Sequence, residues 1–429
     1  MEFEKHLLRY LNDEEINKLV SSFDSESKHA ALLNTSKMSD EMFINLFPHV
    51  IKHPIVTHAY IYDKNEYQLG KSIYHELGCF YLQEPSAMVV SHLLDIKEND
   101  FVLDLCAAPG GKTIQASLNA SQKGIIISND LSKERCRALY DNVTRLGLKN
   151  VVITNNDFKY IYQHYLSRFD RIILDAPCSG SGMFRKDIKM QEDWSLNKVI
   201  KNAMIQYELI DIAYLMLKPG GTMVYSTCSY SYEEDEEVIK HLLSSSDAIL
   251  IDIPDNPLFY KSKDHIGIHL FPHLFPGEGH YICLIKKPGI HKETTYQKHQ
   301  ILSNLLPKEI SSYSSYKFAD NLYALTNDFK YKGLNIMNFG FKVGELVRNG
   351  IIYTHSLSHV LSKYDNQIEL TEEETKKYLE GLEIDKSSNI KGNVLLTYKN
   401  IPLDFSKTNG DKIKNHYPSY LRKKDLIFY

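Results

Sequence analysis

Two cysteines in this chain stand where chemistry is more plausible than packing. Cys178 lies in Asp175-Ala-Pro-Cys-Ser-Gly180 and Cys228 in Ser226-Thr-Cys-Ser-Tyr230, each after a short apolar run. A lone cysteine usually behaves as a small buried hydrophobic residue. Two cysteines among turn residues, at the ends of strands expected to be neighbours, fit that role less well. We expect both thiols to face one pocket, where a thiolate acts as a nucleophile.

Such a thiolate suits methylation of carbon 5 of cytosine. That carbon is a poor nucleophile until a thiolate adds to carbon 6 and converts the ring to an enamine. The reaction also needs a group that stabilises charge on the ring and a base that removes the proton from carbon 5. We expect Asp175 to bind the cytosine amino group and, when protonated, to donate toward the ring nitrogen. The residues alone leave the roles of Cys178 and Cys228 interchangeable.

The segment after Cys228 predicts a helix that begins near Ser231. Ser231-x-x-Glu234 fits a capping box, and the positive end of the helix would favour the thiolate form of Cys228. The acidic run 233–237 suits a first helical turn and is given a structural role.

A cofactor site is predicted at Asp104-Leu-Cys-Ala-Ala-Pro-Gly-Gly-Lys-Thr113, where an apolar run enters a helix. The spacing is neither that of a Walker loop nor Gly-x-Gly-x-x-Gly. Three later strands are each followed or closed by a carboxylate: Asp130 suited to ribose hydroxyls, Asp157 to the adenine end, and Asp175. Ligands bind at the carboxyl ends of strands in open α/β sheets, so the series indicates a nucleoside cofactor.

Short apolar runs alternate with helical segments between about residues 80 and 288. Strands are expected at 101–105, 124–128, 151–154, 171–174 and 221–225, and helices at 112–120, 132–146 and 197–217, the last closed by Lys218-Pro-Gly-Gly221. This alternation is typical of an α/β fold with a parallel, doubly wound sheet. Residues 1–79 are expected to form a small α+β domain, residues 80–288 the core and residues 295–429 a further α+β domain, with a linker at Pro288-Gly289.

Composition excludes several classes of protein. The six cysteines include no Cys-x-x-Cys pair, so no metal site is predicted and the thiols are expected to be reduced in a cytoplasmic protein. No apolar run reaches the roughly 18 residues of a membrane span, and residues 1–5 do not resemble a secretory signal. The net charge is −4, but residues 386–429 carry nine Lys and Arg against three acids. That stretch is either a solvated surface or one that faces phosphates.

From Leu7 to Lys287 these motifs resemble the NOL1/NOP2/Sun family of RNA cytosine-C5 methyltransferases. The resemblance implies a Rossmann-like class I methyltransferase core with a mostly parallel seven-stranded sheet, and S-adenosylmethionine as cofactor. It implies that Cys228 attacks carbon 6 and that Cys178 assists product release. The residues that it assigns to the cofactor are Cys106, Ala107, Ala108, Pro109, Gly110, Gly111, Lys112, Asp130, Asp157 and Asp175.

The layout is most similar to the bacterial ribosomal RNA branch of this family. Phe80-Tyr-Leu-Gln-Glu-Pro-Ser86 resembles the segment that leads into the core, and Asn415-His-Tyr-Pro-Ser-Tyr-Leu-Arg422 resembles an element of a C-terminal PUA-like RNA-binding domain. Ala31-Leu-Leu-Asn-Thr35 lacks the arginine usual in Arg-Val-Asn-Thr. The expected partner is RNA, with ribosomal RNA (16S) preferred over transfer RNA, and the expected state is a monomer without membrane contact.

Three other functions are weighed against this interpretation. Methyl transfer to an amino nitrogen favours Asn/Asp-Pro-Pro-Tyr at the fourth strand end, which is not there. A non-catalytic RNA-binding or ribosome-assembly factor would not need Cys178, Cys228 and Asp175 together. A DNA substrate is disfavoured only by the resemblance of the C-terminal domain.

Overall fold

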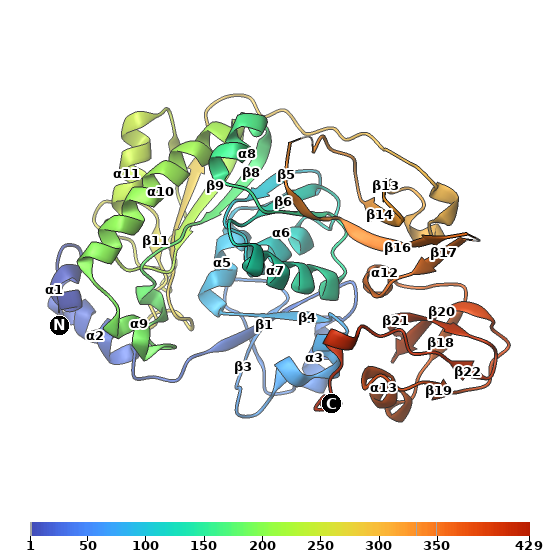
Figure 1. The fold of residues 1–429 in the computed structure, drawn as a ribbon. Coiled ribbons are helices and arrows are strands. Elements are labelled where there is room, and N and C mark those ends of the chain that lie inside the picture. Colours follow the sequence, from blue (N-terminus) through green and yellow to red (C-terminus); the bar gives the residue numbers. More distant parts are fainter. Residues whose placement is uncertain (1, 332, 349) are drawn as a thin grey trace.

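The computed structural model describes residues 2–331, 333–348 and 350–429 (Figure 1). The largest sheet among these residues has nine strands, eight of them in the order β10-β12-β9-β8-β5-β6-β7-β15, with β11 paired to β12. The strands are β5 (Phe101–Asp104), β6 (Ile125–Asn129), β7 (Val151–Thr154), β8 (Phe169–Asp175), β9 (Leu217–Thr227), β10 (Ile249–Ile251), β11 (Ile268–His269), β12 (Tyr281–Lys286) and β15 (Ile336–Phe339). The predicted α/β fold is confirmed.

Seven of these strands, β10 to β7 in that order, form the mostly parallel sheet that was expected. β5, β6, β7, β8 and β9 pair in parallel, while β12 runs antiparallel to β9. β15 comes from the C-terminal part of the chain and adds to the edge by pairing antiparallel with β7. The linker expected after Pro288 therefore leads to a strand that returns to the core sheet.

Side chains of each central strand alternate between two hydrophobic clusters, as a pleated strand requires. Val102 packs in one cluster, whereas Phe101 and Leu103 pack in the other. The first cluster includes residues of α5 (Pro85–Leu93), α6 (Gly111–Asn119) and α7 (Lys133–Leu146), and the second includes residues of α8 (Phe158–Tyr165), α10 (Leu196–Met216) and α11 (Glu236–Ser245). Helices thus cover both faces, which explains why successive residues such as Phe101, Val102 and Leu103 are all apolar.

Two expected helix ends can be compared with the structure. The helix expected at 197–217 is confirmed to within one residue, because α10 ends at Met216, and β9 begins at once with Leu217. Residues 218–221 form an irregularity in the pairing of β8 with β9. The helix expected from Ser231 begins only at Glu236, with Asp235 as its N-cap.

The N-terminal part contributes two separate pieces. A four-stranded antiparallel sheet has the order β2-β3-β1-β4. Its strands are β1 (His29–Leu33), β2 (Ile51–Lys52), β3 (Ala59–Tyr62) and β4 (Phe80–Gln83), and the nearby helices are α3 (Asp40–Leu46), η1 (Leu69–Lys71) and α4 (Ile73–Glu76). Helices α1 (Glu2–Leu7) and α2 (Asp13–Ser22) pack elsewhere, in one cluster with Phe184, Trp194 and Tyr230.

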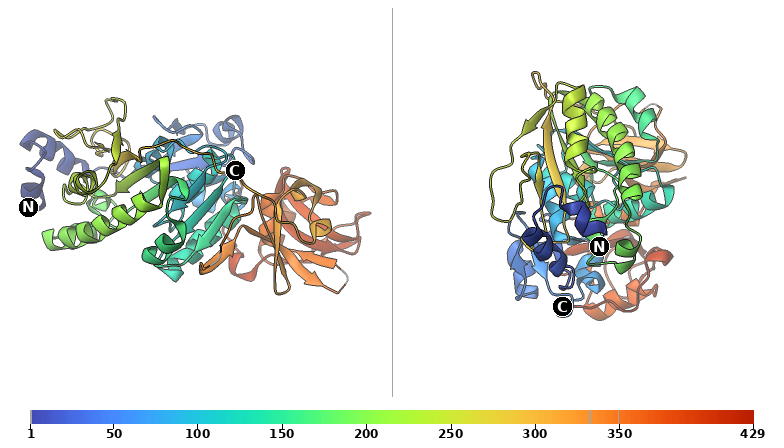
Figure 2. Two further views of the ribbon diagram at one scale, coloured as in Figure 1. Left: turned by 90° about the horizontal axis from the view of Figure 1, so that it is seen from above. Right: turned by 90° about the vertical axis from the view of Figure 1, so that its left-hand side faces the viewer.

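The C-terminal part lies at one end of the molecule (Figure 2). It holds a four-stranded sheet of β13 (Ser314–Phe318), β14 (Asn321–Leu325), β16 (Phe341–Val347) and β17 (Gly350–Tyr353). A five-stranded sheet follows, with β18 (Gln367–Glu369), β19 (Ile384–Asp385), β20 (Gly392–Tyr398), β21 (Ile401–Thr408) and β22 (Lys412–Ile413), together with α12 (His355–Val360) and α13 (Glu372–Leu379). No helix among the described residues is long and apolar enough to cross a membrane.

The end of the chain returns to the N-terminal sheet region. The backbone N–H of Ile73 donates to the carbonyl of Ile427 at 2.9 Å, and the Tyr417 hydroxyl donates to the buried carboxylate of Glu76 at 2.6 Å. Residues of both regions share one hydrophobic cluster. The first and last parts of the chain are therefore packed together beside the core.

Candidate active site

The two cysteine thiols lie next to each other. Cys178 is in the loop after β8, and Cys228 directly follows β9. These strands pair in parallel with Asp175 opposite Ser226, so their carboxyl ends lie at the same edge of the sheet. The Sγ atoms of Cys178 and Cys228 are 3.1 Å apart and both residues are half-buried. One ligand atom is therefore within reach of both thiols.

Glu234 braces the two cysteine loops. Its Oε1 accepts from the backbone N–H of Ser179 at 2.8 Å, and its Oε2 accepts from the hydroxyls of Ser179 and Ser229. Gln206 on α10 donates to the same carboxylate at 3.2 Å and to the carbonyl of Pro177 at 2.8 Å. Glu234 is fully buried, so it connects the residue after Cys178 to the residue after Cys228.

This arrangement corrects the predicted capping box. The Glu234 side chain does not reach back to a helix N-cap, because it is used by the cysteine loops. Burial raises the pKa of Glu234, and its hydrogen bonds to the serines oppose that shift. The sequence signal was ambiguous, since an acid three residues after a serine satisfies the motif whether or not a helix begins there.

Asp175 is paired with Lys112 beside the thiols. Lys112 Nζ lies 2.6 Å from Asp175 Oδ2, and the Ser226 hydroxyl donates to Asp175 Oδ1 at 2.7 Å. Burial by itself would raise the pKa of Asp175, but Lys112, His280 and the hydrogen bond from Ser226 together outweigh burial, and the pKa is lowered. The lowered pKa favours the carboxylate, which accepts hydrogen bonds. The expected donation from a protonated Asp175 stays a prediction.

Lys112 supplies the positive charge beside Cys228 that was expected from the N-terminus of the helix after it. Burial works against the charged form of Lys112, but Asp175 and then Cys228 attract it, and its pKa is raised. The start of α11 is instead crowded with carboxylates, because Glu234, Asp235 and Glu236 are all buried there. The positive charge that attracts Cys228 is thus that of Lys112.

The loop before α6 forms a cradle that fits a nucleoside cofactor. Gly110 has φ of 115°, and a Cβ on it would lie 2.7 Å from the Leu139 side chain. A Cβ on Gly111 would lie 2.7 Å from the Gln83 amide. The Asp130 carboxylate accepts from the backbone N–H of Ala108 at 3.2 Å. Backbone close to the ligand space and a carboxylate at the strand end are the features expected for ribose recognition.

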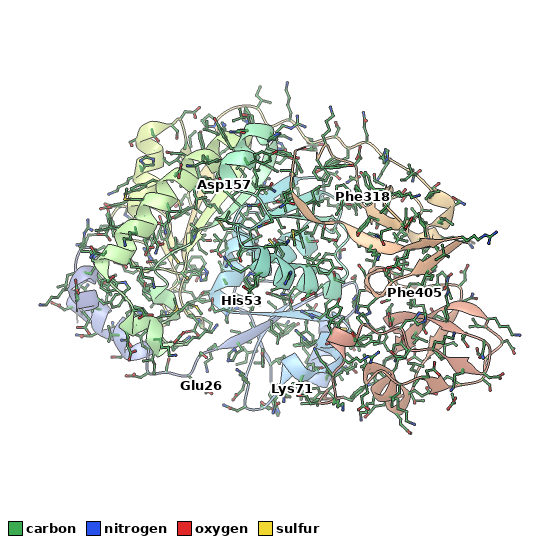
Figure 3. All side chains as sticks on the ribbon, viewed as in Figure 1. Glu26, His53, Lys71, Asp157, Phe318 and Phe405 are labelled. Carbon is green, nitrogen blue, oxygen red and sulfur yellow. The ribbon has the colours of Figure 1, made fainter. Side chains whose placement is uncertain are left out.

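The other cofactor residues of the sequence prediction fall into two groups. Cys106, Ala107 and Ala108 lie along the loop next to buried Asp104, whose pKa is raised to about 7 by burial. Asp157 is exposed and caps α8, where its carboxylate accepts from the backbone N–H of Lys159 at 2.9 Å (Figure 3). Asp157 is thus at the rim of the sheet, and the cap explains its position without a ligand.

His280 was missed by the sequence prediction. It immediately precedes β12, whose Tyr281 is opposite Thr227 of β9, the residue before Cys228. Its Nδ1 lies 3.0 Å from the hydroxyl of Ser86, which donates in turn to Glu84. Burial, and after it the charge of Lys112, lower the pKa of His280 to about 4. No motif marks a lone histidine after Gly-Glu-Gly, and only the strand pairing brings it to the site.

Family models match three parts of the chain, and known proteins match most of its length. Residues 91–286 match the model described as 16S rRNA methyltransferase RsmB/F, residues 1–85 the N-terminal domain of 16S rRNA methyltransferase RsmF, and residues 365–423 the methyltransferase RsmF PUA domain. Ribosomal RNA small subunit methyltransferase F of Shewanella woodyi is 32% identical, with 85% of this chain and 83% of that protein covered. The chain belongs to the 16S rRNA methyltransferase RsmB/F family.

Further similarities agree with this membership. Ribosomal RNA small subunit methyltransferase F of Shewanella oneidensis is 30% identical over 85% of this chain and 83% of its own length. A solved structure, a methyltransferase homolog protein from Pyrococcus horikoshii, aligns with a TM-score of 0.59 and 26% identity over 66% of this chain and 93% of that chain. As an RsmB/F family member the protein methylates RNA, and its cofactor is S-adenosylmethionine, as predicted.

The basic stretch of the RsmF-type PUA region is partly used inside the molecule. Lys423 forms an ion pair with buried Glu76, and Lys386 lies 2.7 Å from Glu374. Arg422 and Lys424 are exposed. In the N-terminal region, Leu32 of the segment that lacks the expected arginine is buried. Asn34 of the same segment donates to the carbonyl of Leu146 at 2.9 Å and so connects this region to the core.

Proposed function

We propose that the protein methylates carbon 5 of cytosine in 16S ribosomal RNA through a covalent bond between Cys228 Sγ and carbon 6. The observation that carries this proposal is the 3.1 Å contact between the thiols of Cys178 and Cys228 beside the Asp175–Lys112 pair. The pKa of Cys178 is raised well above the usual value, first by its hydrogen bond to Cys228 and then by burial. The raised pKa favours the thiol form of Cys178, and we assign Cys178 as the donor in this contact and Cys228 as the thiolate.

The side chains then divide the reaction among them. Cys228 Sγ bonds to carbon 6, and the displaced electron pair makes carbon 5 nucleophilic. S-adenosylmethionine, when bound, supplies the electrophilic methyl group. A base takes the proton from carbon 5, the double bond between carbons 5 and 6 forms again, and the bond from carbon 6 to Cys228 Sγ breaks. The Cys178 thiol, 3.1 Å away, donates to the departing thiolate and so assists release.

Asp175 and Lys112 prepare the cytosine ring for attack by the thiolate. The ionised carboxylate of Asp175 accepts from the cytosine amino group, while Lys112 balances its charge and holds it in place at 2.6 Å. The same ammonium stabilises negative charge on Cys228. A buried cation that is already in place stabilises developing charge without reorganisation during the reaction.

The remaining assignments belong to the same proposal. The cofactor is held by residues 106–112 together with Asp130, Asp157 and Asp175. Residues 80–288 form the methyltransferase domain, and residues 1–79 and 295–429 are RNA-binding domains of a cytoplasmic monomer. The fit of the Gly110–Gly111 cradle and of the Asp130 carboxylate supports the cofactor assignment.

Bisulfite sequencing tests the proposal. Ribosomal and transfer RNA from a strain that lacks the gene would be compared with RNA from the same strain carrying wild type or Cys228→Ser. We expect 5-methylcytosine in 16S RNA with wild type only. Purified Cys228→Ser should still bind S-adenosylmethionine in calorimetry, which separates loss of the nucleophile from loss of the fold. Full methylation by Cys228→Ser, or methylation confined to transfer RNA, would contradict the proposal.

A further inference from the structure

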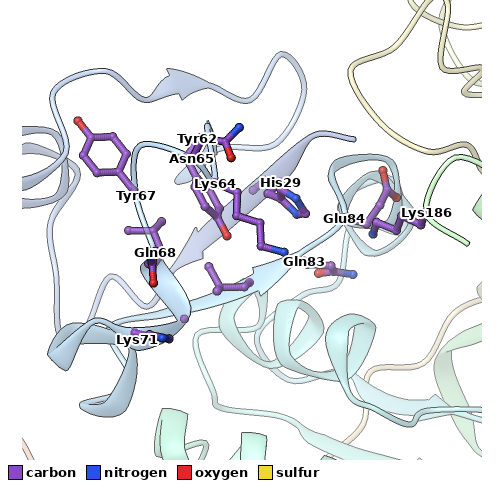
Figure 4. Close-up of a pocket in the computed structure, with 14 residues that line it drawn as sticks. His29, Tyr62, Lys64, Asn65, Tyr67, Gln68, Lys71, Gln83, Glu84 and Lys186 are labelled. Atoms are coloured by element: carbon purple, nitrogen blue, oxygen red, sulfur yellow. The ribbon is translucent and has the colours of Figure 1, made fainter. Parts of the chain in front are cut away.

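A groove lies between the N-terminal sheet and the entrance to the core (Figure 4). It encloses about 750 Å³ and is lined by residues of β1, β3, the 64–71 segment and β4, and by Glu84 and Lys186. Three exposed lysines, Lys64, Lys71 and Lys186, line it. In Figure 4 they are spread along the groove, and Lys64 reaches across it toward Gln83. The groove is thus a long hollow with positive charge at intervals.

The charge of these lysines is largely uncompensated. Lys71 lies 3.3 Å from Asp425, but both side chains are more than half exposed, so that pair is weak. Among the residues that the structure describes, Lys64 and Lys186 have no carboxylate partner within ion-pair distance. The pKa of His29, at the middle of the groove, is lowered by burial and then by Lys64 and Lys186. The positive charges of Lys64 and Lys186 therefore both act on the inside of the groove.

Glu84, the acidic residue that lines the groove, is held by hydrogen bonds. Its carboxylate accepts from the backbone N–H groups of Ala87 at 2.8 Å and Glu278 at 2.7 Å, and from Ser86. Glu84 is about nine-tenths buried. The three lysines outnumber its single negative charge, and the groove keeps its preference for an anion.

The inner end of the groove borders the cofactor loop. Gln83 lines the groove and packs on Gly111, the residue before Lys112. Its Oε1 is buried without a hydrogen-bond partner among the described residues. Lys186 follows the short helix η2 (Ser181–Met183) that comes after the Cys178 loop. An extended anion in the groove would therefore lie beside the loop that carries Lys112 and the segment that follows Cys178.

We propose that this groove binds the ribose–phosphate backbone of the single-stranded RNA next to the target cytosine, with phosphates on Lys64 and Lys186. The inference rests on the proposed function, which it deepens by naming the path of the substrate. A cytosine that reaches a buried thiol must leave its helix, and the nucleotides beside it are then single-stranded. A repeating anion fits lysines spaced along a groove better than a single small anion would.

Binding of a labelled oligonucleotide tests the proposal without any methyl transfer. The probe is a fluorescein-labelled oligocytidine RNA of about 12 nucleotides, and anisotropy gives Kd at several NaCl concentrations. We expect Lys64→Ala/Lys186→Ala to raise Kd about tenfold at low salt. The slope of log K against log salt should fall by about 1.4, because two phosphate contacts to a single strand are lost. Lys64→Arg/Lys186→Arg should restore both values.

A matched control uses two exposed lysines outside the groove. Lys201→Ala/Lys263→Ala removes the same charge, and we expect it to change Kd by less than about twofold, with an unchanged slope. An unchanged slope in Lys64→Ala/Lys186→Ala would overturn the groove proposal, and so would a loss of RNA binding equal to that of the control. Binding of polyglutamate in place of the RNA would assign the groove to an acidic protein and would also overturn the groove proposal. Activity of Cys228→Ser would refute the proposed function and leave the binding result standing.

Discussion

Ser229 donates its hydroxyl hydrogen to Glu234 Oε2 at 2.6 Å. The residue after Cys228 is thereby tied to a carboxylate that also holds the residue after Cys178. The two serine hydroxyls also lie 3.2 Å from each other, and Gly182 donates its backbone N–H to the carbonyl of Cys228 at 2.8 Å. The carboxylate adds to these direct contacts by binding both loops at once. The relative position of the two thiols depends on a residue that has no thiol chemistry of its own.

Replacing Glu234 should separate the two loops. Glu234→Ala leaves several buried donors unsatisfied, and we expect a loss of about 3 kcal/mol in the free energy of unfolding. Methyl transfer should fall by more than about 100-fold, with a smaller fall for Glu234→Gln, because the serine hydroxyls can accept from the new amide. Urea titration and a tritiated methyl assay measure the two effects. Glu237→Ala, which removes a partly exposed partner of Arg9, is the control and should lower the free energy of unfolding by less than about 1 kcal/mol. Equal effects at both positions would contradict the special role of Glu234.

Cys178→Ala should trap the covalent intermediate. Without the thiol that lies 3.1 Å from Cys228 Sγ, the departing thiolate loses its hydrogen-bond donor, and the bond to carbon 6 persists. We expect a protein–RNA band that resists reducing agents on denaturing gels when substrate RNA and S-adenosylmethionine are present. The double variant Cys178→Ala/Cys228→Ser should give no such band. If Cys178→Ala turns over normally without an adduct, the release role is wrong.

His280 should make stability fall in mild acid. Its pKa in the folded protein is lowered to about 4, whereas an unfolded histidine titrates near about 6.5. Between these values the unfolded chain binds a proton that the folded chain does not, so the free energy of unfolding falls as the pH drops through this window. The advantage of wild type over His280→Gln should therefore shrink by roughly 2 to 3 kcal/mol between pH 7.5 and 4.5.

Urea titrations across this pH range provide the measurement. His164 is exposed, and His164→Gln should keep a constant difference from wild type at every pH. A constant difference for His280→Gln as well would mean that the folded protein protonates His280 normally.

Arg422 and Lys424 should contribute to RNA binding, whereas Lys423 should not be grouped with them. Arg422→Ala/Lys424→Ala removes two exposed charges, and we expect the salt dependence of binding to a 16S RNA fragment to become shallower by about 1.4 in slope. Lys423→Ala breaks an ion pair with buried Glu76 and should lower the melting temperature instead. Filter binding and thermal melts separate these effects. A slope that stays the same in the double variant would make the basic stretch a solvated surface.

The core of this protein was predictable because its signals are local. Runs such as 101–104 and 151–154 are apolar up to their last residue and are followed by turn residues and a helix, a pattern that a parallel sheet covered on both faces produces. The cofactor loop and the motifs around Cys178 and Cys228 are also contiguous in the chain. Their chemistry follows from residue type and from the rule that parallel strands present their carboxyl ends at one edge.

The sequence by itself thus determined the fold class, the strand ends and the pair of thiols. Tertiary structure alone decided that Lys112 supplies the charge beside Cys228, that Glu234 joins the cysteine loops instead of capping a helix, and that His280 reaches the site. Each of these contacts joins side chains from separate elements, and a hydrogen-bonding group is satisfied by whichever partner the packed chain brings within about 3 Å. The spacing of residues along the chain does not indicate which partner that is.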